Sequence, residues 1–386
     1  MKIARLEFLV LNVSEKTNWT FIRLTADDGT TGLGESSLNG WEAAQKACAE
    51  ELGARLTGKS PDQFASALSV FPHSPGGLIA SSIASAVEQA VTDLRAKRAG
   101  VPLHALLGKP ALQAVQVYAN INRGARDRTP SGVAHAAREA VKAGFTAIKI
   151  APFDGVYWGD ADKDALERKI ATGIARIFSI REAVGPEIKV MVDCHWRFDE
   201  ALTLRLLSEI RDARLYWLEC PISENPDRFS ALRRVRENAN ALGIRLAGAE
   251  RQIGESGFAP YIEERLLDTV MPDVKYAGGY GEMLKIAGAC KRHDIGFAPH
   301  NPTGPVCNLA SMHLCAVAPS FLILEHQLAE SDLYFEAVRG FRPRLLNGCF
   351  EIPSAPGLGV ELDDAVFRAH PYRPLDPHAN LDPRLG

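Results

Sequence analysis

The sequence lacks the features that mark membrane-bound and secreted proteins. None of its apolar runs approaches the ~20 residues that a bilayer-spanning helix needs. Its start, MKIARLEFLVLNV, alternates apolar and other residues as a strand does, and no small-residue cleavage site follows. Seven cysteines are scattered without a CxxC pair, which favours reduced and buried thiols. These absences predict a cytoplasmic protein that is not associated with a membrane.

The sequence also lacks an excess of one charge and a dinucleotide motif. Its 44 Lys and Arg and 47 Asp and Glu give a net charge of -3, so no nucleic-acid partner is expected. No GxGxxG motif follows the first predicted strand, because Gly29, Gly32 and Gly34 lie in a hairpin with the wrong spacing. Hydrophobic residues make up 46% of the 386 residues, which is enough for a sizeable core and excludes general disorder.

Eight short β-rich runs alternate with helical stretches in the second part of the chain. The later runs start roughly 24 to 30 residues apart, the length of one strand and one helix. Several are apolar on both faces, as strands of a buried parallel sheet are. This order predicts an α/β fold with a closed (β/α)8-type barrel. The runs are VQVYANIN (115–122), FTAIKIAP (145–152), IKVMVDCH (188–195), LYWLECPI (215–222), IRLAGAE (244–250), TVMPDVKYA (269–277), IGFAPHN (295–301) and FLILEHQ (321–327).

The pattern of predicted strands and helices changes at about residue 114, which predicts two domains. Residues 1–114 would form an α+β capping domain, with a β-hairpin followed by a helical stretch from about 40 to 107. Residues 115–339 would form the barrel, and the tail 340–386, which has many Pro and Gly residues, would return to the cap. An insertion, APFDGVYWGDADKD, follows the second run, where a barrel builds active-site loops.

Polar residues recur at the carboxyl end of the barrel strands. In a barrel these ends meet at one mouth, which is where active sites of this architecture lie. A random scatter of charge would not favour the same end of so many strands, so we expect a functional site there. The residues are Lys149, Asp193, His195, Glu219, Glu250, Asp273, Lys275, His300 and Glu325.

Three of these residues are candidate metal ligands. Asp193, Glu219 and Glu250 stand on three consecutive strands, where their oxygens can meet around a hard cation such as Mg²⁺. Without a cation, converging carboxylates would repel and raise one another's pKa. The other interpretation is that each is an ordinary ion-pair partner in a loop. This interpretation is disfavoured because all three stand at the same end of consecutive strands.

The imidazole and amine groups are candidate acids and bases. Asp273 on the sixth strand can orient His300 on the seventh and raise its basicity, which makes a general base. His195 lies two residues after Asp193, so strand alternation places it beside the metal. Lys275 has the parity of Asp273 and is a rival base or a substrate contact. Lys149 could neutralise a substrate carboxylate, act as a base, or simply lie in solvent.

Three further residues are candidate substrate contacts. Glu325 could accept a hydrogen bond from a substrate oxygen, or it could be a structural carboxylate that helps to close the barrel. Tyr157 and Trp158 lie in the insertion and could cover the substrate, although loop aromatics also serve as packing.

The chain resembles the mandelate racemase-like branch of the enolase superfamily. The motifs that carry this resemblance are AIKI, VMVDCHWR, YWLECPI, LAGAER, MPDVKYAGG and APHNPTGP, in this order. The resemblance implies an α+β cap on a modified (β/α)7β barrel and a symmetric homo-oligomer. It also implies Mg²⁺ at Asp193, Glu219 and Glu250, an acid/base dyad of His300 and Asp273, and Glu325 near the substrate carboxylate. Such enzymes pair a Lys or His base with Mg²⁺ that stabilises an ene-diolate.

One triplet narrows the implied reaction. Asp193-Cys194-His195 is similar to that of sugar-acid dehydratases such as galactonate and mannonate dehydratases, in which the extra His is associated with protonating the departing hydroxyl. The product would be a 2-keto-3-deoxy acid. Lys149-Ile150-Ala151 lacks the second Lys of the Lys-x-Lys pair found in racemases and cycloisomerases. A racemase, an epimerase or a lactone cycloisomerase is the second hypothesis, and a non-catalytic metal-binding barrel is the third.

Overall fold

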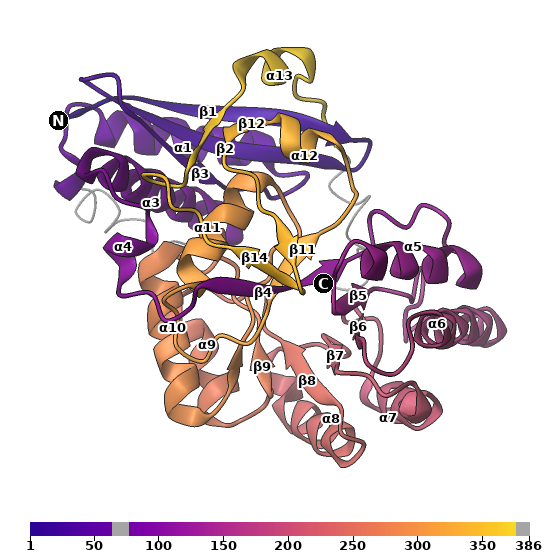
Figure 1. The fold of residues 1–386 in the computed structure, drawn as a ribbon. Coiled ribbons are helices and arrows are strands. Elements are labelled where there is room, and N and C mark those ends of the chain that lie inside the picture. The colour runs from indigo at the N-terminus through magenta and orange to yellow at the C-terminus, as the bar shows by residue number, and fades with distance from the viewer. Residues whose placement is uncertain (64–76, 376–386) are drawn as a thin grey trace.

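The computed structural model describes residues 1–63 and 77–375, and its centre is a barrel of eight parallel strands (Figure 1). The first seven strands pair in chain order, and the eighth pairs with the first. A bridge between Phe297 and Phe321 joins the last two, so the barrel is closed. One strand corresponds to each predicted run and is shorter than it, and β4 begins one residue before its run. The strands are β4 (Ala114–Asn120), β5 (Ala147–Ile150), β6 (Lys189–Asp193), β7 (Trp217–Glu219), β8 (Arg245–Gly248), β9 (Thr269–Val270), β10 (Gly296–Phe297) and β11 (Leu324–Gln327).

An α-helix lies between each two consecutive strands of the barrel, so the predicted (β/α)7β order is confirmed. Several helices begin where the sequence offers a capping side chain. Thr129, Asp162 and Asp199 each accept a hydrogen bond from a backbone N–H in the first turn of the helix that follows. The helices are α5 (Pro130–Lys142), α6 (Lys163–Val184), α7 (Glu200–Ile210), α8 (Phe229–Ala241), α9 (Gly254–Glu263), α10 (Gly279–His293) and α11 (Pro305–Cys315).

The barrel interior is filled by one side chain from each strand or its flanking segment. The layer combines large and small residues, and the Tyr118 and Trp217 rings meet edge to face with their centroids 5.4 Å apart. The side chains of this layer pack against one another and form a floor beneath the polar residues at the carboxyl ends of the strands. The layer consists of Tyr118, Ala147, Met191, Trp217, Ala247, Met271, Ala298 and Ile323.

The cap is a three-stranded antiparallel sheet with helices against it. Gly34 lies so close to the long helix of the cap that a Cβ there would stand 1.9 Å from the Ala86 carbonyl oxygen, which explains a glycine inside this strand. The predicted helical stretch contains helices on both sides of residues 64–76, which lie outside the described residues. The elements are β1 (Ile3–Ser14), β2 (Thr17–Ala26), β3 (Thr31–Glu35), α1 (Glu42–Leu56), a 3-10 turn (Pro61–Gln63), α3 (Gly77–Ala99) and α4 (His104–Leu107).

The tail after the barrel contacts both the cap and the first barrel strand. Figure 1 shows its yellow helix α13 beside the indigo strands, and Asn18 of β2 donates a hydrogen bond to the Arg373 carbonyl at 2.8 Å. One tail strand, β14, pairs antiparallel with β4. Residues 376–386 of the predicted returning segment lie outside the described residues. The elements after the last barrel strand are α12 (Leu333–Glu336), β12 (Val338–Gly340), β13 (Leu345–Leu346), β14 (Cys349–Glu351), β15 (Val360–Leu362) and α13 (Asp364–Ala369).

None of the helices in the described residues is both long enough and apolar enough to cross a membrane.

Candidate active site

Strand alternation carries polar side chains to the mouth of the barrel. Residues two apart on a strand face the same side, so the residue two positions after each floor residue points toward the mouth. This step leads from Met191 to Asp193 and from Trp217 to Glu219. Glu250 is the exception, three residues after its floor residue, because Ala249 with a φ of 67° turns the chain. The other members of the set reached by the same step are Asn120, Lys149, Asp273, His300 and Glu325.

Asp193 and His195 form the first contact pair in the mouth. The His195 N–H donates to Asp193 Oδ1 at 2.8 Å, and His195 Nε2 lies 2.7 Å from Oδ2. Strand alternation predicts His195 on the same face as Asp193, but β6 ends at Asp193 and His195 has a φ of 47°. A left-handed turn therefore folds the ring back onto the carboxylate. Burial opposes ionisation of Asp193, but the attraction of His195 and Lys149 outweighs it and lowers its pKa to about 2.

Lys149 stands between two buried carboxylates. Its Nζ donates to Glu219 Oε1 at 2.7 Å and lies 2.9 Å from Glu325 Oε1. Burial disfavours the charged amine, yet the two carboxylates raise the pKa of Lys149 well above its ordinary value. Lys149 is therefore paired and buried rather than exposed to solvent, and its role as a base or as an electrostatic group stays a prediction.

Glu325 is held by three donors at the edge of the mouth. Its oxygens accept hydrogen bonds from Asn120 Nδ2 at 2.7 Å and from the Asn301 N–H at 2.9 Å, besides the contact with Lys149. Burial raises the pKa of the Glu325 carboxyl, but the positive charges of Lys149 and His300 lower it by more than burial raises it. The net shift of this pKa is downward. Glu325 also lies on the strand that closes the barrel, and it is fully buried.

His300 lies between Glu250 and Asp273. Its Nδ1 is 2.8 Å from Asp273 Oδ2, and its Nε2 is 3.5 Å from Glu250 Oε2. Burial lowers the pKa of the His300 imidazole, but Glu250 and the hydrogen bond to Asp273 raise it to a value above its ordinary one. The pair that the sequence predicted from adjacent strands is therefore in hydrogen-bond contact.

Lys275 lies behind Asp273 rather than in the mouth. Its Nζ donates to Asp273 Oδ2 at 2.6 Å, and no part of the residue is exposed. Burial opposes its charge, but Asp273 raises the pKa of the Lys275 amine above its ordinary value. Lys275 is therefore held in place by Asp273, and its role as a base or a substrate contact stays a prediction. Lys275 does not continue the alternation because the chain turns at Asp273, whose carbonyl accepts hydrogen bonds from the Tyr276 and Ala277 N–H groups.

The candidate metal ligands offer hard oxygen donors. Asp193 and Glu219 are direct partners across β6 and β7. Burial raises the pKa of Glu219 well above its ordinary value, and the negative charges of Asp193 and Glu250 add to the shift. In the described parts of the chain no three His, Cys, Asp or Glu side chains stand ready-made around one metal position. Glu219 and Asp193 instead have an oxygen in contact with Lys149 and His195, respectively. The donor chemistry and the excess of carboxylates fit a divalent cation such as Mg²⁺.

The insertion after β5 packs on the segment that carries His195. The Trp158 N–H donates to the Arg197 carbonyl at 3.0 Å, and an Arg197 guanidinium N–H donates to the Val156 carbonyl at 3.1 Å. The Tyr157 and Trp158 rings have their centroids 5.5 Å apart, and Trp158 is 41% exposed. The insertion therefore lies next to the β6 side of the mouth and leaves the Trp158 side chain partly exposed.

Two polar residues that the structure connects to the mouth, Asn120 and Glu35, are not among those predicted from the sequence. Asn120 ends the first barrel strand as the other site residues end theirs, so its position was a usable signal. Glu35 of the cap is also fully buried, and it binds backbone N–H groups of Gly304 and Cys307. Nothing in the sequence links Glu35 to a loop that lies far along the chain.

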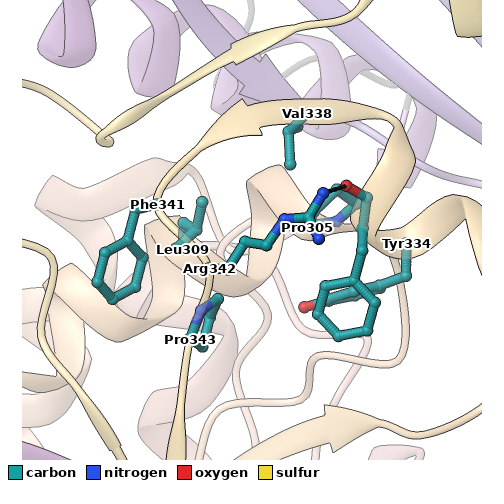
Figure 2. A pocket seen from close by; sticks show the side chains of 8 residues that line it. Pro305, Leu309, Tyr334, Val338, Phe341, Arg342 and Pro343 are labelled. Atoms are coloured by element: carbon teal, nitrogen blue, oxygen red, sulfur yellow. Dashed lines mark hydrogen bonds between the residues drawn. The ribbon is translucent and has the colours of Figure 1, made fainter.

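A small apolar pocket lies elsewhere, between α11, α12 and the tail. Figure 2 shows Pro305, Leu309, Tyr334 and Phe341 around it, with the Arg342 guanidinium donating to the Phe335 carbonyl at 3.3 Å. None of the predicted site residues lines this pocket, so it is separate from the barrel mouth.

Comparison with protein families places the two domains in one group. A family model described as mandelate racemase / muconate lactonizing enzyme, N-terminal domain, matches residues 8–108. A second, described as enolase C-terminal domain-like, matches residues 132–366. The two matches together cover most of the chain.

Individual relatives are similar over nearly their full length. A D-galactonate dehydratase from Verminephrobacter eiseniae is 29% identical over 357 residues, 90% of each chain. Another from Xanthomonas euvesicatoria pv. vesicatoria is 27% identical over 385 residues, 97% of this chain and 96% of the relative. A solved mandelate racemase/muconate lactonizing enzyme from Jannaschia sp. CCS1 has a TM-score of 0.84 at 26% identity, covering 97% of this chain and 98% of that one.

One further solved structure shares the fold. It is a Burkholderia xenovorans protein provisionally named an L-alanine-DL-glutamate epimerase and bound to magnesium and fumarate. It has a TM-score of 0.87 at 24% identity, with 99% of both chains covered.

Proposed function

The chain belongs to the enolase superfamily, in its mandelate racemase and muconate lactonizing enzyme branch, and from this premise we propose that it is a Mg²⁺-dependent sugar-acid dehydratase. The observation that carries the proposal is the pair of imidazoles at the mouth. His195 and His300 follow β6 and β10, which are not neighbours, and each is held by its own carboxylate, Asp193 or Asp273. The similarity to D-galactonate dehydratases supports an aldonic acid as substrate.

His300 is the base that removes the proton at C2 of the acid. Because Asp273 is buried, and its pKa is lowered despite that burial, its carboxylate accepts the Nδ1 proton. The Nε2 atom of the neutral ring then carries the lone pair and faces the mouth, where it lies near Glu250. The raised pKa of His300 suits an acceptor of a proton near neutral pH.

His195 is the acid for the second half of the reaction. Its side chain is 38% exposed, the most open of the charged groups paired at the mouth, so a substrate hydroxyl can reach it. His195 gives its proton to the C3 hydroxyl as the C3–O bond breaks and water leaves. The resulting enol tautomerises to a 2-keto-3-deoxy acid, so the net change is the loss of one water molecule.

Asp193, Glu219 and Glu250 would hold the Mg²⁺ ion, which when bound stabilises the negative charge that develops on the substrate carboxylate. Lys149 supplies a second, fixed positive charge beside Glu219 and Glu325. It draws the substrate carboxylate toward this side of the mouth and leaves the C2 hydrogen to His300.

An epimerase of the same family is the second candidate, because a structure provisionally named as one shares the fold. A two-base epimerase needs a base on the face opposite His300. The strand that usually carries it ends in Lys149-Ile150-Ala151, and Lys149 is paired with two carboxylates. Dehydration therefore accounts better for the residues present.

The test is a screen of aldonic and aldaric acids with Mg²⁺, read as keto-acid formation. His300→Asn should abolish both dehydration and exchange of the C2 proton with deuterium. His195→Asn should abolish dehydration but keep exchange. His135→Asn, at an exposed position on α5, is the control and should behave as the wild type. Wild-type rates in either mouth variant would overturn its role, and a change of optical rotation without keto acid would establish the epimerase instead.

A further inference from the structure

The cap forms hydrogen bonds with the barrel segment that follows β9. This segment contains Asp273. The Ser81 hydroxyl of α3 donates to the Tyr276 carbonyl, and the Gly278 N–H donates to Ser85 Oγ at 3.1 Å. From the cap loop after β3, the Ser37 carbonyl accepts a hydrogen bond from the Tyr276 hydroxyl at 2.9 Å. The segment that positions Asp273 is therefore fixed from outside the barrel.

The cap also forms hydrogen bonds with the segment that follows His300, through the buried carboxylate of Glu35. Glu35 Oε1 accepts from the Gly304 N–H, and Oε2 accepts from the Cys307 N–H, both at 2.8 Å. These N–H groups lie at the start of α11. The first N–H groups of a helix have no carbonyl acceptor within the helix, so Glu35 supplies one. A Cβ on Gly304 would lie 2.8 Å from both Glu35 oxygens, so this close approach requires the glycine.

Lys275 connects this carboxylate with the dyad. Its Nζ donates to Asp273 Oδ2 at 2.6 Å and to Cys307 Sγ at 3.6 Å, and it is attracted by Glu35. Its backbone N–H donates to Asp273 Oδ1 at 2.8 Å. Both oxygens of Asp273 are thus held by one residue, and Oδ2 is also the atom that meets His300 Nδ1.

We propose that Glu35 and Lys275 are positioning residues that hold the Asp273–His300 dyad in its working geometry. The inference rests on the proposed role of His300 as the base. Glu35 fixes the loop four residues after His300, and Lys275 fixes the plane of the Asp273 carboxylate. The His300 ring is thereby held from two sides by groups that do not touch the substrate.

A purely structural role would give a different result, and the chain offers a matched control. Glu88 is another cap carboxylate at the start of a barrel helix, since its Oε2 accepts from the Tyr280 N–H of α10 at 2.9 Å. Glu88 has no contact with Lys275 among the hydrogen bonds and ion pairs of the described residues. Glu88→Gln should therefore reduce stability without changing the chemistry.

The experiment compares Glu35→Gln, Lys275→Met and Glu88→Gln in the full-length enzyme with Mg²⁺ and D-galactonate, or the best acid of the screen. Glu35→Gln and Lys275→Met should lower kcat on the order of 10- to 100-fold with KM little changed, because a slightly misplaced base slows only the chemical step. Glu88→Gln should keep kcat. A kcat like the wild type in a folded Glu35→Gln would overturn the proposal, even if Lys275→Met does not fold.

A second measurement separates this proposal from the proposed function. The proton between His300 Nδ1 and Asp273 should give a downfield NMR resonance in the wild type that is shifted or lost in Glu35→Gln and kept in Glu88→Gln. This readout needs no substrate. If the wild type dehydrates no acid, the proposed function fails while the resonance still decides the positioning role. An unchanged resonance in Glu35→Gln would overturn it.

Discussion

Lys149 and Glu219 form a fully buried ion pair at the mouth of the barrel, with 2.7 Å between Nζ and Oε1. The same ammonium group lies 2.9 Å from Glu325. The Lys149 ammonium thus offsets part of the negative charge of the four carboxylates at the mouth, which are Asp193, Glu219, Glu250 and Glu325. Mg²⁺ and Lys149 would act on the same set of carboxylates, so their effects on stability should depend on each other.

Lys149→Met should therefore destabilise the protein most when Mg²⁺ is absent. Removing one partner of a buried ion pair costs about 3 to 5 kcal/mol, because the other charge stays buried. Saturating Mg²⁺ should recover part of this loss, since the ion supplies positive charge near Glu219. Urea unfolding with Mg²⁺ and with a chelator measures the difference.

The control for this variant is Lys97→Met in the cap. Lys97 also has a buried carboxylate partner, Asp93, at 3.0 Å, but it lies in the cap. Its loss of stability should be the same with and without Mg²⁺. An equal loss under both conditions for Lys149→Met as well would contradict a shared electrostatic site.

The wild type itself should be stabilised by Mg²⁺. Because the ion binds only the folded site, a concentration of 100 times its Kd should raise the free energy of unfolding by about 2.7 kcal/mol. Glu250→Gln should remove most of this gain, whereas Glu224→Gln should keep it. Glu224 is also a buried carboxylate near β8, where it accepts a hydrogen bond from the Ala249 N–H, but it is not a proposed ligand. A gain that survives in Glu250→Gln would exclude this residue as a ligand.

The barrel and most of its polar mouth could be predicted because they follow from local patterns. The two-residue period of a strand connects Met191 with Asp193 and Trp217 with Glu219, and the strand order follows the sequence order. The rule still holds for Asp273 and His300, just past the ends of β9 and β10, but it fails once the backbone turns. His195 and Lys275 lie beyond β6 and β9, in turns whose backbone conformation the alternation of residue types does not encode.

The docking of the cap could not be predicted because its contacts join segments far apart in the sequence. Glu35 reads as one of many acidic residues near a hairpin, and Gly304 as one of many glycines in a loop. Only the folded chain shows that the carboxylate caps α11 and that the glycine makes room for it. Such contacts depend on how two domains pack, which hydrophobic periodicity does not specify.

Gly304→Ala tests this contact without removing a charged group. The new Cβ would meet both Glu35 oxygens at 2.8 Å, so the loop after His300 has to shift. We expect kcat to fall on the order of 10-fold or more, as for other small displacements of a base. Gly281→Ala is the control, because a Cβ there meets nothing within 4 Å and the position is inside α10. It should keep kcat and gain up to about 1 kcal/mol of stability. Equal kcat values in the two variants would show that the loop is insensitive to this contact.

Acid should destabilise the fold through His313 of α11, well away from the carboxylates of the mouth. This ring is fully buried, with Nδ1 3.1 Å from His104 Nδ1, and burial lowers its pKa to about 3. Since the unfolded chain has a pKa of about 6.5 at this group, protonation favours unfolding as the pH falls below 6.5. The contribution between pH 7 and pH 5 is about 2 kcal/mol. His313→Gln should flatten the pH dependence of urea unfolding by about this amount, whereas His135→Gln should reproduce the wild-type curve. A His313→Gln curve parallel to that of the wild type would show that this imidazole does not carry the acid sensitivity.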